Sequence, residues 1–421
     1  MKHPLSLLAL LVLPAVAAAE PFDVSVTGGK ADAANVVVRF PVPKGGDVSA
    51  NVLELSTGGM VPVQTTGPAL TDDPAVKQYV VFVLPKLKAG ETVTGKLKTV
   101  NYFVQPPHFE FVEKAGTPTE LVFASVNMKR PVLQYFNLKR DAADHYYTFK
   151  PFHNVYDPAT GKVMLTNTSA KTAKDGQFPH HRGLFFGFNR ITYGTNQQAD
   201  IWHGTNNVFS EHEKTLATEA GEVVGRQRSQ IAWHGRDGQT FATEEREVAA
   251  YAVPDTPGTL IDWSTVLTTK LDKVRLDGDP QHAGFHFRAN MEVSKNGKAN
   301  TYYLRPDGKG KPGETRNWEP KAKTPDAKTI NLPWNACSFV TGDKRYTVLR
   351  INHPDNPKET RGSERDYGRF GDYFEYDLTP DKPLKLKYRV WVQEGEMTAE
   401  QCAAIAAAFA SPPATKAVAG K

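Results

Sequence analysis

Residues 385–391 read KLKYRVW, and their alternation of polar and apolar side chains decides the fold. Residues two apart in an extended chain point to the same side of a sheet, so this spacing predicts a β-strand. Similar strand-like runs occur at 35–40, 77–84, 119–126 and 259–269. The 33 glycines and 30 prolines provide the turns between them. We therefore expect an all-β protein, of the sandwich or barrel type.

The pattern divides into two domains and a short helix. Residues 20–108 hold several strand-like runs and few histidines, and LPKLKAGETVTGKL at 84–97 resembles the late strands of an immunoglobulin-like sandwich. Consecutive prolines at 106 and 107 mark a boundary, because proline interrupts strand pairing. Residues 115–410 form a second, larger β domain. The alanine-rich run 398–409 predicts a helix that begins at a threonine cap.

The two ends of the chain carry different signals. Residues 1–19 are interpreted as a secretory signal peptide, with Lys2 as a positive start, an apolar core at 7–13 and a small-residue cleavage site at 17–19. The protein is therefore expected in the periplasm or outside the cell. No later stretch approaches the roughly 18 apolar residues of a membrane span. The tail, residues 411–421, is rich in proline, alanine and lysine, a composition that predicts disorder.

Composition argues against a nucleic-acid partner, but it does not determine whether the two cysteines pair or how many chains associate. The formal charge of +5 comes from acidic and basic residues that are interspersed along the chain, so no nucleic-acid surface is expected. Cys337 and Cys402 can pair in an exported protein or remain free, because the geometry of a disulfide is strict and the sequence does not show it. The oligomeric state is also open.

The richest polar stretch is PHHRG at 179–183, directly before the apolar run 184–188. Imidazole changes between proton donor and acceptor near neutral pH and is the commonest metal ligand. We predict a site here, because loops at strand ends commonly carry function. Alternation in an extended chain sends His180 and His181 to opposite faces, so the segment forms one wall of a pocket. The residues predicted to be catalytic are His180, His181 and Arg182, His203 in DIWHG (200–204), and His286.

The opposite wall is expected on the strand HAGFHFR at 282–288. Alternation puts its histidines and arginine on one face and its phenylalanines on the other, which also fits a solvated face over a packed sheet. On the pocket interpretation, His286 or His181 is the acid or base. Arg182 and Arg288 then hold a carboxylate, a carbonyl or an oxyanion.

Other residues are candidates for substrate binding. The Trp202 indole can stack on a sugar ring or lie in the core. Glu245 can act as an acid or base or lie on a solvated sheet face. His153, before a turn, can reach the pocket or be a satisfied core histidine. The predicted binding residues are Arg130, His153, Tyr156, Trp202, Glu245 and Arg288.

No cofactor is expected, since the sequence lacks the HExxH and EF-hand patterns. Scattered histidines can still assemble around a divalent metal ion, and His180, His203 and His286 are the set proposed for it. The G-x-S-x-G elbow of one class of serine hydrolases is absent as well.

Several segments resemble a family of exported bacterial proteins of unassigned function, labelled "methane oxygenase, PmoA type". The resemblance covers roughly 115–395, and PHHRG is its best marker. In the family this marker more often follows an aspartate and a histidine, where this chain has Gln177 and Phe178, so part of the family's site is expected to be missing. The segments are RPVLQYF (130–136), PFHNVYDPATG (151–161), FPHHRGLFFGF (178–188), DIWHG (200–204) and PLKLKYRVWVQEG (383–395).

The many strands also look like the antiparallel supersandwich of galactose mutarotases and polysaccharide lyases. This similarity implies a large β-supersandwich over 115–410, although a fold alone does not fix function. Such enzymes move protons beside a carbonyl or open a sugar ring, often without a cofactor. The leading hypothesis is an exported carbohydrate-active enzyme with lyase or epimerase-type chemistry on a sugar or glycan. The alternatives are a non-catalytic glycan-binding protein, a metal-dependent oxidase, and a glycoside hydrolase, for which no carboxylate pair is identified.

Overall fold

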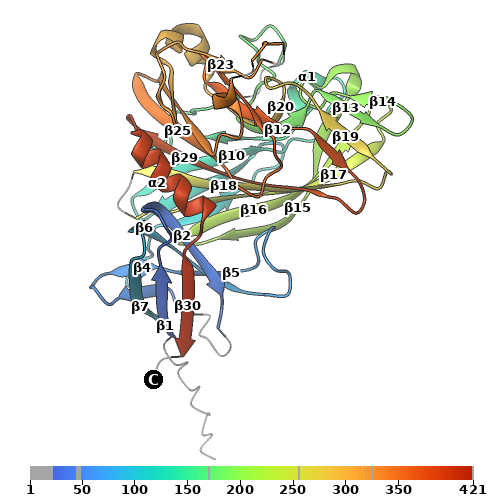
Figure 1. Ribbon diagram of the computed structural model, residues 1–421. Helices are drawn as coiled ribbons and strands as arrows, with labels where there is room; N and C mark the ends of the chain where they lie inside the picture. The colour runs from blue at the N-terminus through green and yellow to red at the C-terminus, as the bar shows by residue number, and fades with distance from the viewer. Residues whose placement is uncertain are drawn as a thin grey trace, which may run out of the picture.

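A computed structural model shows a small β-sandwich attached to a large two-layer β domain (Figure 1). The predicted signal peptide, residues 1–19, lies outside the part of the chain that the structure describes. That part comprises residues 22–43, 49–168, 171–254, 257–319, 321–324 and 326–419.

The small sandwich is built from two antiparallel sheets. Phe40 and Phe82 meet edge to face between them, with ring centroids 6.4 Å apart. One sheet has the order β30 (Ala414–Ala419), β1 (Phe22–Thr27), β7 (Thr92–Lys98), β3 (Val52–Leu55) and β4 (Met60–Pro62), and the other β2 (Ala33–Pro41), β6 (Tyr79–Leu87) and β5 (Gln64–Thr66).

The C-terminal tail was predicted to be disordered, and this prediction is wrong for Ala414–Ala419. These residues form β30, which pairs antiparallel with β1 from Phe22 opposite Ala419 to Thr27 opposite Ala414. In Figure 1 the red strand β30 runs beside the blue strand β1. The exposed edge of β1 offers unpaired N–H and C=O groups, and a tail of any composition without proline can satisfy them.

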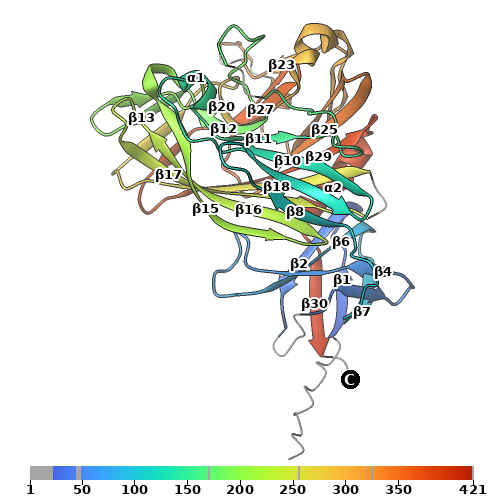
Figure 2. The ribbon, with the colours of Figure 1, turned by 180° about the vertical axis from the view of Figure 1, so that it is seen from behind.

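The large domain is built on two nine-stranded antiparallel sheets, which confirms the predicted all-β fold. Figures 1 and 2 show one sheet close to the small sandwich, the inner sheet, and one farther from it, the outer sheet. The outer sheet has the order β23 (Arg316–Asn317), β26 (Arg361–Arg365), β27 (Arg369–Tyr373), β20 (Ala283–Arg288), β12 (Leu184–Phe188), β11 (Phe152–Val155), β10 (Met128–Phe136), β9 (Thr119–Ser125) and β8 (His108–Val112). The inner sheet has the order β15 (Phe209–Ala220), β16 (Val224–His234), β17 (Thr240–Tyr251), β18 (Gly258–Thr268), β29 (Leu384–Glu394), β25 (Lys344–Asn352), β24 (Trp334–Thr341), β21 (Tyr302–Arg305) and β22 (Gly308–Lys309). A smaller, four-stranded sheet has the order β14 (Gln197–Ala199), β13 (Arg190–Tyr193), β19 (Val274–Asp277) and β28 (Tyr376–Leu378).

The alternating stretch 385–391 lies in β29, in the middle of the inner sheet. Leu386, Tyr388 and Val390 pack into the core between the two sheets. Trp391 points to the other face and packs in the cluster that joins the inner sheet to the small sandwich and the C-terminal helix. One face of this strand is therefore buried along the core, and the other is buried from Arg389 to Trp391, whereas Lys385 on that face is exposed.

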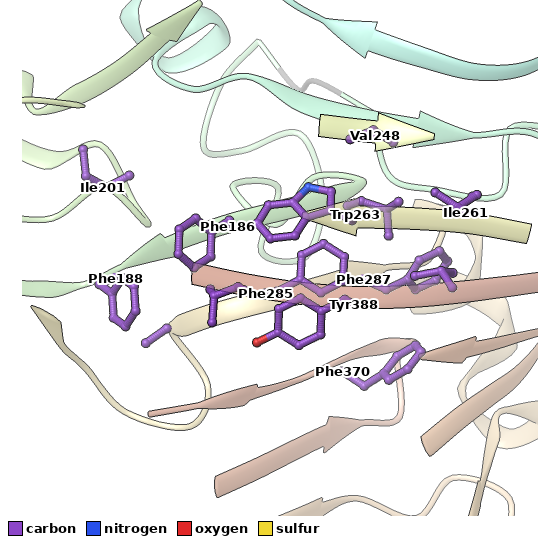
Figure 3. Packing of buried hydrophobic residues seen from close by; sticks show 14 of the residues in the cluster. Phe186, Phe188, Ile201, Val248, Ile261, Trp263, Phe285, Phe287, Phe370 and Tyr388 are labelled. Atoms are coloured by element: carbon purple, nitrogen blue, oxygen red, sulfur yellow. The ribbon is translucent and has the colours of Figure 1, made fainter. Parts of the chain in front are cut away.

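Aromatic rings fill the space between the sheets (Figure 3). Phe285 of the outer sheet lies 4.6 Å, between ring centroids, from both Trp263 and Tyr388 of the inner sheet. Burial of each such side chain contributes roughly 1.5–3 kcal/mol. Because Phe285 and Phe287 of β20 point into this core, the residues between them point to the opposite face of the outer sheet.

The C-terminal helix, α2 (Ala399–Ala410), begins as predicted at Thr398, whose side chain accepts a hydrogen bond from the Gln401 N–H. It packs at the junction of the two domains (Figure 1). Cys402 on this helix and Cys337 on β24 are both free and buried. None of the helices that the structure describes is long and apolar enough to cross a membrane.

Candidate functional site

Four histidine rings from three loops gather at the outer sheet, on the face turned away from the intersheet core. His180 and His181 precede β12, His203 follows β14 (Gln197–Ala199), and His282 precedes β20. The ring centroid of His180 lies 4.3 Å from that of His181 and 4.6 Å from that of His203. The rings of His203 and His282 are 5.0 Å apart. We call these four residues the histidine cluster.

The PHHRG segment is a turn, so the prediction that alternation separates His180 from His181 is wrong. The His181 N–H donates to the carbonyl oxygen of Phe178, which has a φ of 51°. The turn brings both imidazoles to the same side of the chain. Gly183 ends the turn with a φ of 59°, and a Cβ there would lie 2.1 Å from the backbone oxygen of His153. Only glycine fits where the loop joins the sheet.

Two aspartates orient the two more exposed histidines. Asp200 accepts hydrogen bonds from the His203 backbone N–H and from its Nδ1, both at 2.8 Å. Asp279 accepts from Nδ1 of His282 at 2.9 Å. A carboxylate on Nδ1 fixes the tautomer and leaves Nε2 as the acceptor or ligand atom. The side chains of His203 and His282 are 27% and 30% exposed, so the cluster is open to solvent at this end.

Burial sets the charge state of His180 and His181, which form the buried end of the cluster. Burial, together with the nearby His203 and Lys150, lowers the pKa of His180 to about 2. Burial likewise holds the pKa of His181 well below its usual value, with His180 and Arg369 adding to the effect. His180 and His181 are therefore neutral at physiological pH. Burial alone would raise the pKa of Asp279, but hydrogen bonds from His282 and Asn189 lower it to about 2, so this carboxylate is charged.

Trp202 and His286 lie beneath the cluster and do not face solvent. Trp202 is fully buried, with its ring 5.5 Å from His181 and 4.8 Å from His286. It cannot be the sugar platform that the sequence predicted. The Nε2 atom of His286 is hydrogen-bonded to the backbone oxygen of Ala283 at 2.8 Å. His286 is fully buried against Trp202 and does not face solvent, contrary to what its predicted catalytic role requires.

Arg182 and Arg288 do not hold a substrate group, contrary to prediction. Both are fully buried, and burial lowers the pKa of each to about 10. Arg182 donates to the backbone oxygens of Tyr146 and Tyr147, both in the short helix α1 (His145–Thr148). Arg288 donates to the backbone oxygens of Tyr367 and Gln177. These arginines fix the loops around the cluster.

Four other predicted binding residues lie outside the cluster. Arg130 packs on the Phe123 ring near the start of β10, and Tyr156 donates to Glu120. His153 stacks on Tyr135, at 4.4 Å between ring centroids. Glu245 lies half-buried on β17, in the inner sheet. All four residues lie in or next to strands of the sandwich, but their side chains do not point toward the histidine cluster.

Three residues of the cluster can hold a metal ion, and the set differs from the predicted one. The ligand atoms of His180, His181 and His282 lie within 4.8 Å of one another. The predicted set had His203 and His286 in place of His181 and His282. The sequence did carry a signal for His282 and for the two aspartates, which were not predicted, because Asp-x-x-His occurs at 200–203 and again at 279–282.

Similarity to solved structures is low, and no curated protein matches the sequence. An alpha-mannosidase from Enterococcus faecalis V583 is 11% identical, with a TM-score of 0.40 over 95% of this chain and 46% of that one. A glycosyl hydrolase family 38 protein from Enterococcus faecalis is 11% identical, with a TM-score of 0.41 over 95% and 47%. A galactose mutarotase related enzyme from Lactobacillus acidophilus is 11% identical, with a TM-score of 0.29 over 69% and 98%. The chain spans about half the length of the two Enterococcus proteins.

A family model matches residues 126–407, which are 282 of the 421 residues. The description of this family is a family of unknown function, DUF6807. None of the comparisons gives the label "methane oxygenase, PmoA type". The matched region contains the whole histidine cluster and both aspartates that orient it. The chain belongs to the DUF6807 family.

Proposed function

We propose that this protein is an exported enzyme that acts on a sugar or glycan at the histidine cluster, by proton transfer of the lyase or epimerase kind. The observation that carries the proposal is the Asp200–His203 pair at the open end of the cluster. The aspartate binds Nδ1 of the ring at 2.8 Å and leaves Nε2 available to substrate. This is how a carboxylate orients a general-base histidine in hydrolases of unrelated folds.

The surroundings of the cluster favour a neutral substrate. Arg182 and Arg288 direct donors to backbone oxygens, and Lys150 donates to the Trp202 carbonyl at 2.7 Å. The cations that border the site therefore serve the protein's own loops. The buried imidazoles of His180 and His181, which are neutral, match hydroxyl and carbonyl groups, because these donate and accept hydrogen bonds without charge. A sugar fits this description better than a carboxylate or phosphate ligand does.

His203→Gln tests the proposal. The full chain is incubated with a panel of neutral and acidic oligosaccharides. Elimination is followed by ultraviolet absorption of the unsaturated product, and epimerisation by nuclear magnetic resonance. We expect turnover by the wild type and a loss of 100-fold or more in His203→Gln, since a positioned acid or base typically contributes about 10²–10⁴-fold. Asp200→Asn should lose less, because it removes only the orienting charge.

A matched control is available in another histidine beside an aspartate. Nδ1 of His353 lies 3.3 Å from an oxygen of Asp355, and this pair is next to α2, where His353 meets the Phe409 ring. His353→Gln should keep full turnover. If the wild type turns over no substrate but binds a glycan, and His203→Gln binds it equally well, the protein is a glycan-binding protein and the proposed reaction is wrong.

A further inference from the structure

The buried end of the histidine cluster holds imidazole nitrogens that have no protein partner. His181 is only 1% exposed, and neither of its ring nitrogens has a hydrogen-bond partner among the described residues. The same is true of Nε2 of His180 within that part of the chain. An unsatisfied buried polar group costs about 1–3 kcal/mol, so proteins rarely keep one without a reason. Adjacent nitrogens of this kind indicate a ligand that binds lone pairs.

The spacing of the nitrogens identifies the kind of ligand. Ligand atoms of His180, His181 and His282 all lie within 4.8 Å of one another. Nitrogens bound to one tetrahedral ion at 2.0–2.1 Å are separated by about 3.3 Å. The separation in the structure exceeds this value by at most about 1.5 Å, and we infer that small rotations of the rings close this gap when the ion binds. A sugar ring is larger than the space between these atoms, whereas a single metal ion matches it.

The outer contacts of the cluster are those of a metal site. Metal-binding histidines almost always donate their second ring N–H to a carboxylate, a carbonyl or water. Asp279 takes this position at Nδ1 of His282, at 2.9 Å, and is itself bound by the Asn189 amide at 3.1 Å. Asp200 and Asp279 together supply two negative charges next to the cluster, which match a divalent cation.

We propose that His180, His181 and His282 bind one divalent transition-metal ion, such as Zn²⁺. Imidazole ligands suit zinc, copper, iron and nickel, and do not suit magnesium or calcium. Three protein ligands leave an open position, which is the arrangement of catalytic rather than structural zinc sites. The half-exposed side chain of His203, 4.6 Å from the His180 ring, borders the solvent side where a substrate oxygen would approach.

The proposed ion deepens the chemistry of the same site and does not depend on the nature of the substrate. A bound divalent ion acts as a Lewis acid on a carbonyl or hydroxyl oxygen. His203 would remain the group that takes or gives the proton. The two tasks are therefore divided between the buried and the exposed parts of the cluster.

Zn²⁺ binding tests the site directly. The full chain, purified without a histidine tag and stripped with EDTA, is titrated with Zn²⁺ by calorimetry, and bound metal is counted by elemental analysis. We expect one ion per chain. Removing one ligand in His282→Ala or His180→Ala should weaken binding by 100-fold or more. Asp279→Asn should weaken it by about 10–100-fold, as carboxylates behind metal ligands do.

Two controls guard against misfolding and surface binding. His353→Ala removes a histidine outside the cluster and should keep wild-type affinity. His181→Phe keeps an aromatic ring of similar size, and should lose the ion while its circular dichroism spectrum and melting temperature stay close to those of the stripped wild type. Substoichiometric Zn²⁺, or equal affinity in the wild type, His282→Ala and Asp279→Asn, would overturn the site.

The same variants separate this inference from the proposed function. If Zn²⁺ binds one to one and is lost in His282→Ala, but no oligosaccharide is turned over, the metal site stands and the sugar chemistry falls. If turnover depends on His203 while EDTA-stripped protein remains fully active and binds no Zn²⁺, the enzyme stands and the metal site falls.

Discussion

Two buried polar regions of the large domain differ in how their atoms are satisfied. The first is the Glu244–Arg246 network, which lies between the sheets. Arg246 donates to both oxygens of Glu244, at 2.7 and 3.0 Å, and to the backbone oxygen of Pro151 at 3.2 Å. Trp233 and Thr265 each donate to the same carboxylate at 3.0 Å. The second is the histidine cluster, where the most buried ring, that of His181, has no partner on either nitrogen among the described residues.

This difference in hydrogen bonding indicates which buried polar region stabilises the fold and which is available to bind a ligand. A closed network such as that of Glu244 and Arg246 joins three strands, β16, β17 and β18, and leaves no atom for a ligand. The histidine cluster provides nitrogens that are fixed in place and unused by the fold. Polarity alone does not distinguish the two regions, since both are buried beside tryptophan rings. The two regions are distinguished by the number of buried polar atoms that lack a hydrogen-bond partner.

Arg246→Ala should have the largest effect on stability. The change leaves the Glu244 carboxylate buried and without its counter-ion, and breaking a buried pair in this way typically costs about 3–5 kcal/mol. We expect a loss of this size in the free energy of unfolding, measured by urea denaturation. Glu245→Gln, on the other face of the same strand, should change it by less than about 0.5 kcal/mol. A small loss in Arg246→Ala would mean that the network does not stabilise the sandwich.

Gly183→Ala should have the next largest effect, at the base of the histidine cluster. The φ of 59° is strained for alanine, and the new Cβ would lie 2.1 Å from the His153 backbone oxygen. We expect a loss of about 2–3 kcal/mol in the free energy of unfolding, together with weaker Zn²⁺ binding, because the loop must shift. Gly238→Ala, in the hairpin between β16 and β17, is the control for φ alone: its φ is 77° and nothing lies within 4 Å of the added carbon.

The strands could be predicted from the sequence because each carries its own evidence. The runs at 119–126, 259–269 and 385–391 match β9, β18 and β29 to within one to three residues at either end. Alternation and turn residues act locally, so a single segment reveals them. The tail 414–419 could not be predicted in this way. Its order depends on β1, almost 400 residues earlier, and composition contains no information about such a partner.

The site was predicted in part, and for a similar reason. His180, His181 and His203 were found because residue type and a position at strand ends are visible in the sequence. Their arrangement was not found, because it depends on the positive φ of Phe178, a conformation that nothing in the sequence signals. His282 was assigned to the wall beside His286 because HAGFHFR was treated as continuous strand, whereas β20 begins only at Ala283.

Acid should destabilise the protein through its buried histidines, and His153 tests this beside the Glu244–Arg246 network. Burial lowers the pKa of His153 well below its usual value, and Arg246 and His212 lower it further. Below about pH 6.5 the unfolded chain binds a proton that the folded chain does not, so stability falls as the pH falls. His153→Phe should flatten this slope by up to about 1.4 kcal/mol per pH unit. An unchanged slope between pH 7 and 5 would show that His153 is not held neutral.

His181→Phe should have the smallest effect on stability, and it is the sharpest test of the comparison. The His181 ring lies among those of His180, Phe185 and Trp202, at centroid distances of 4.3, 5.8 and 5.5 Å, so phenylalanine meets an aromatic surface there. No protein hydrogen bond to the ring is lost among the described residues. We expect the free energy of unfolding of metal-free protein to change by less than about 1.5 kcal/mol, as for other swaps of similar volume, or to rise. A loss as large as that of Arg246→Ala would show that the His181 ring supports the fold as the network does, and would remove the contrast between the two regions.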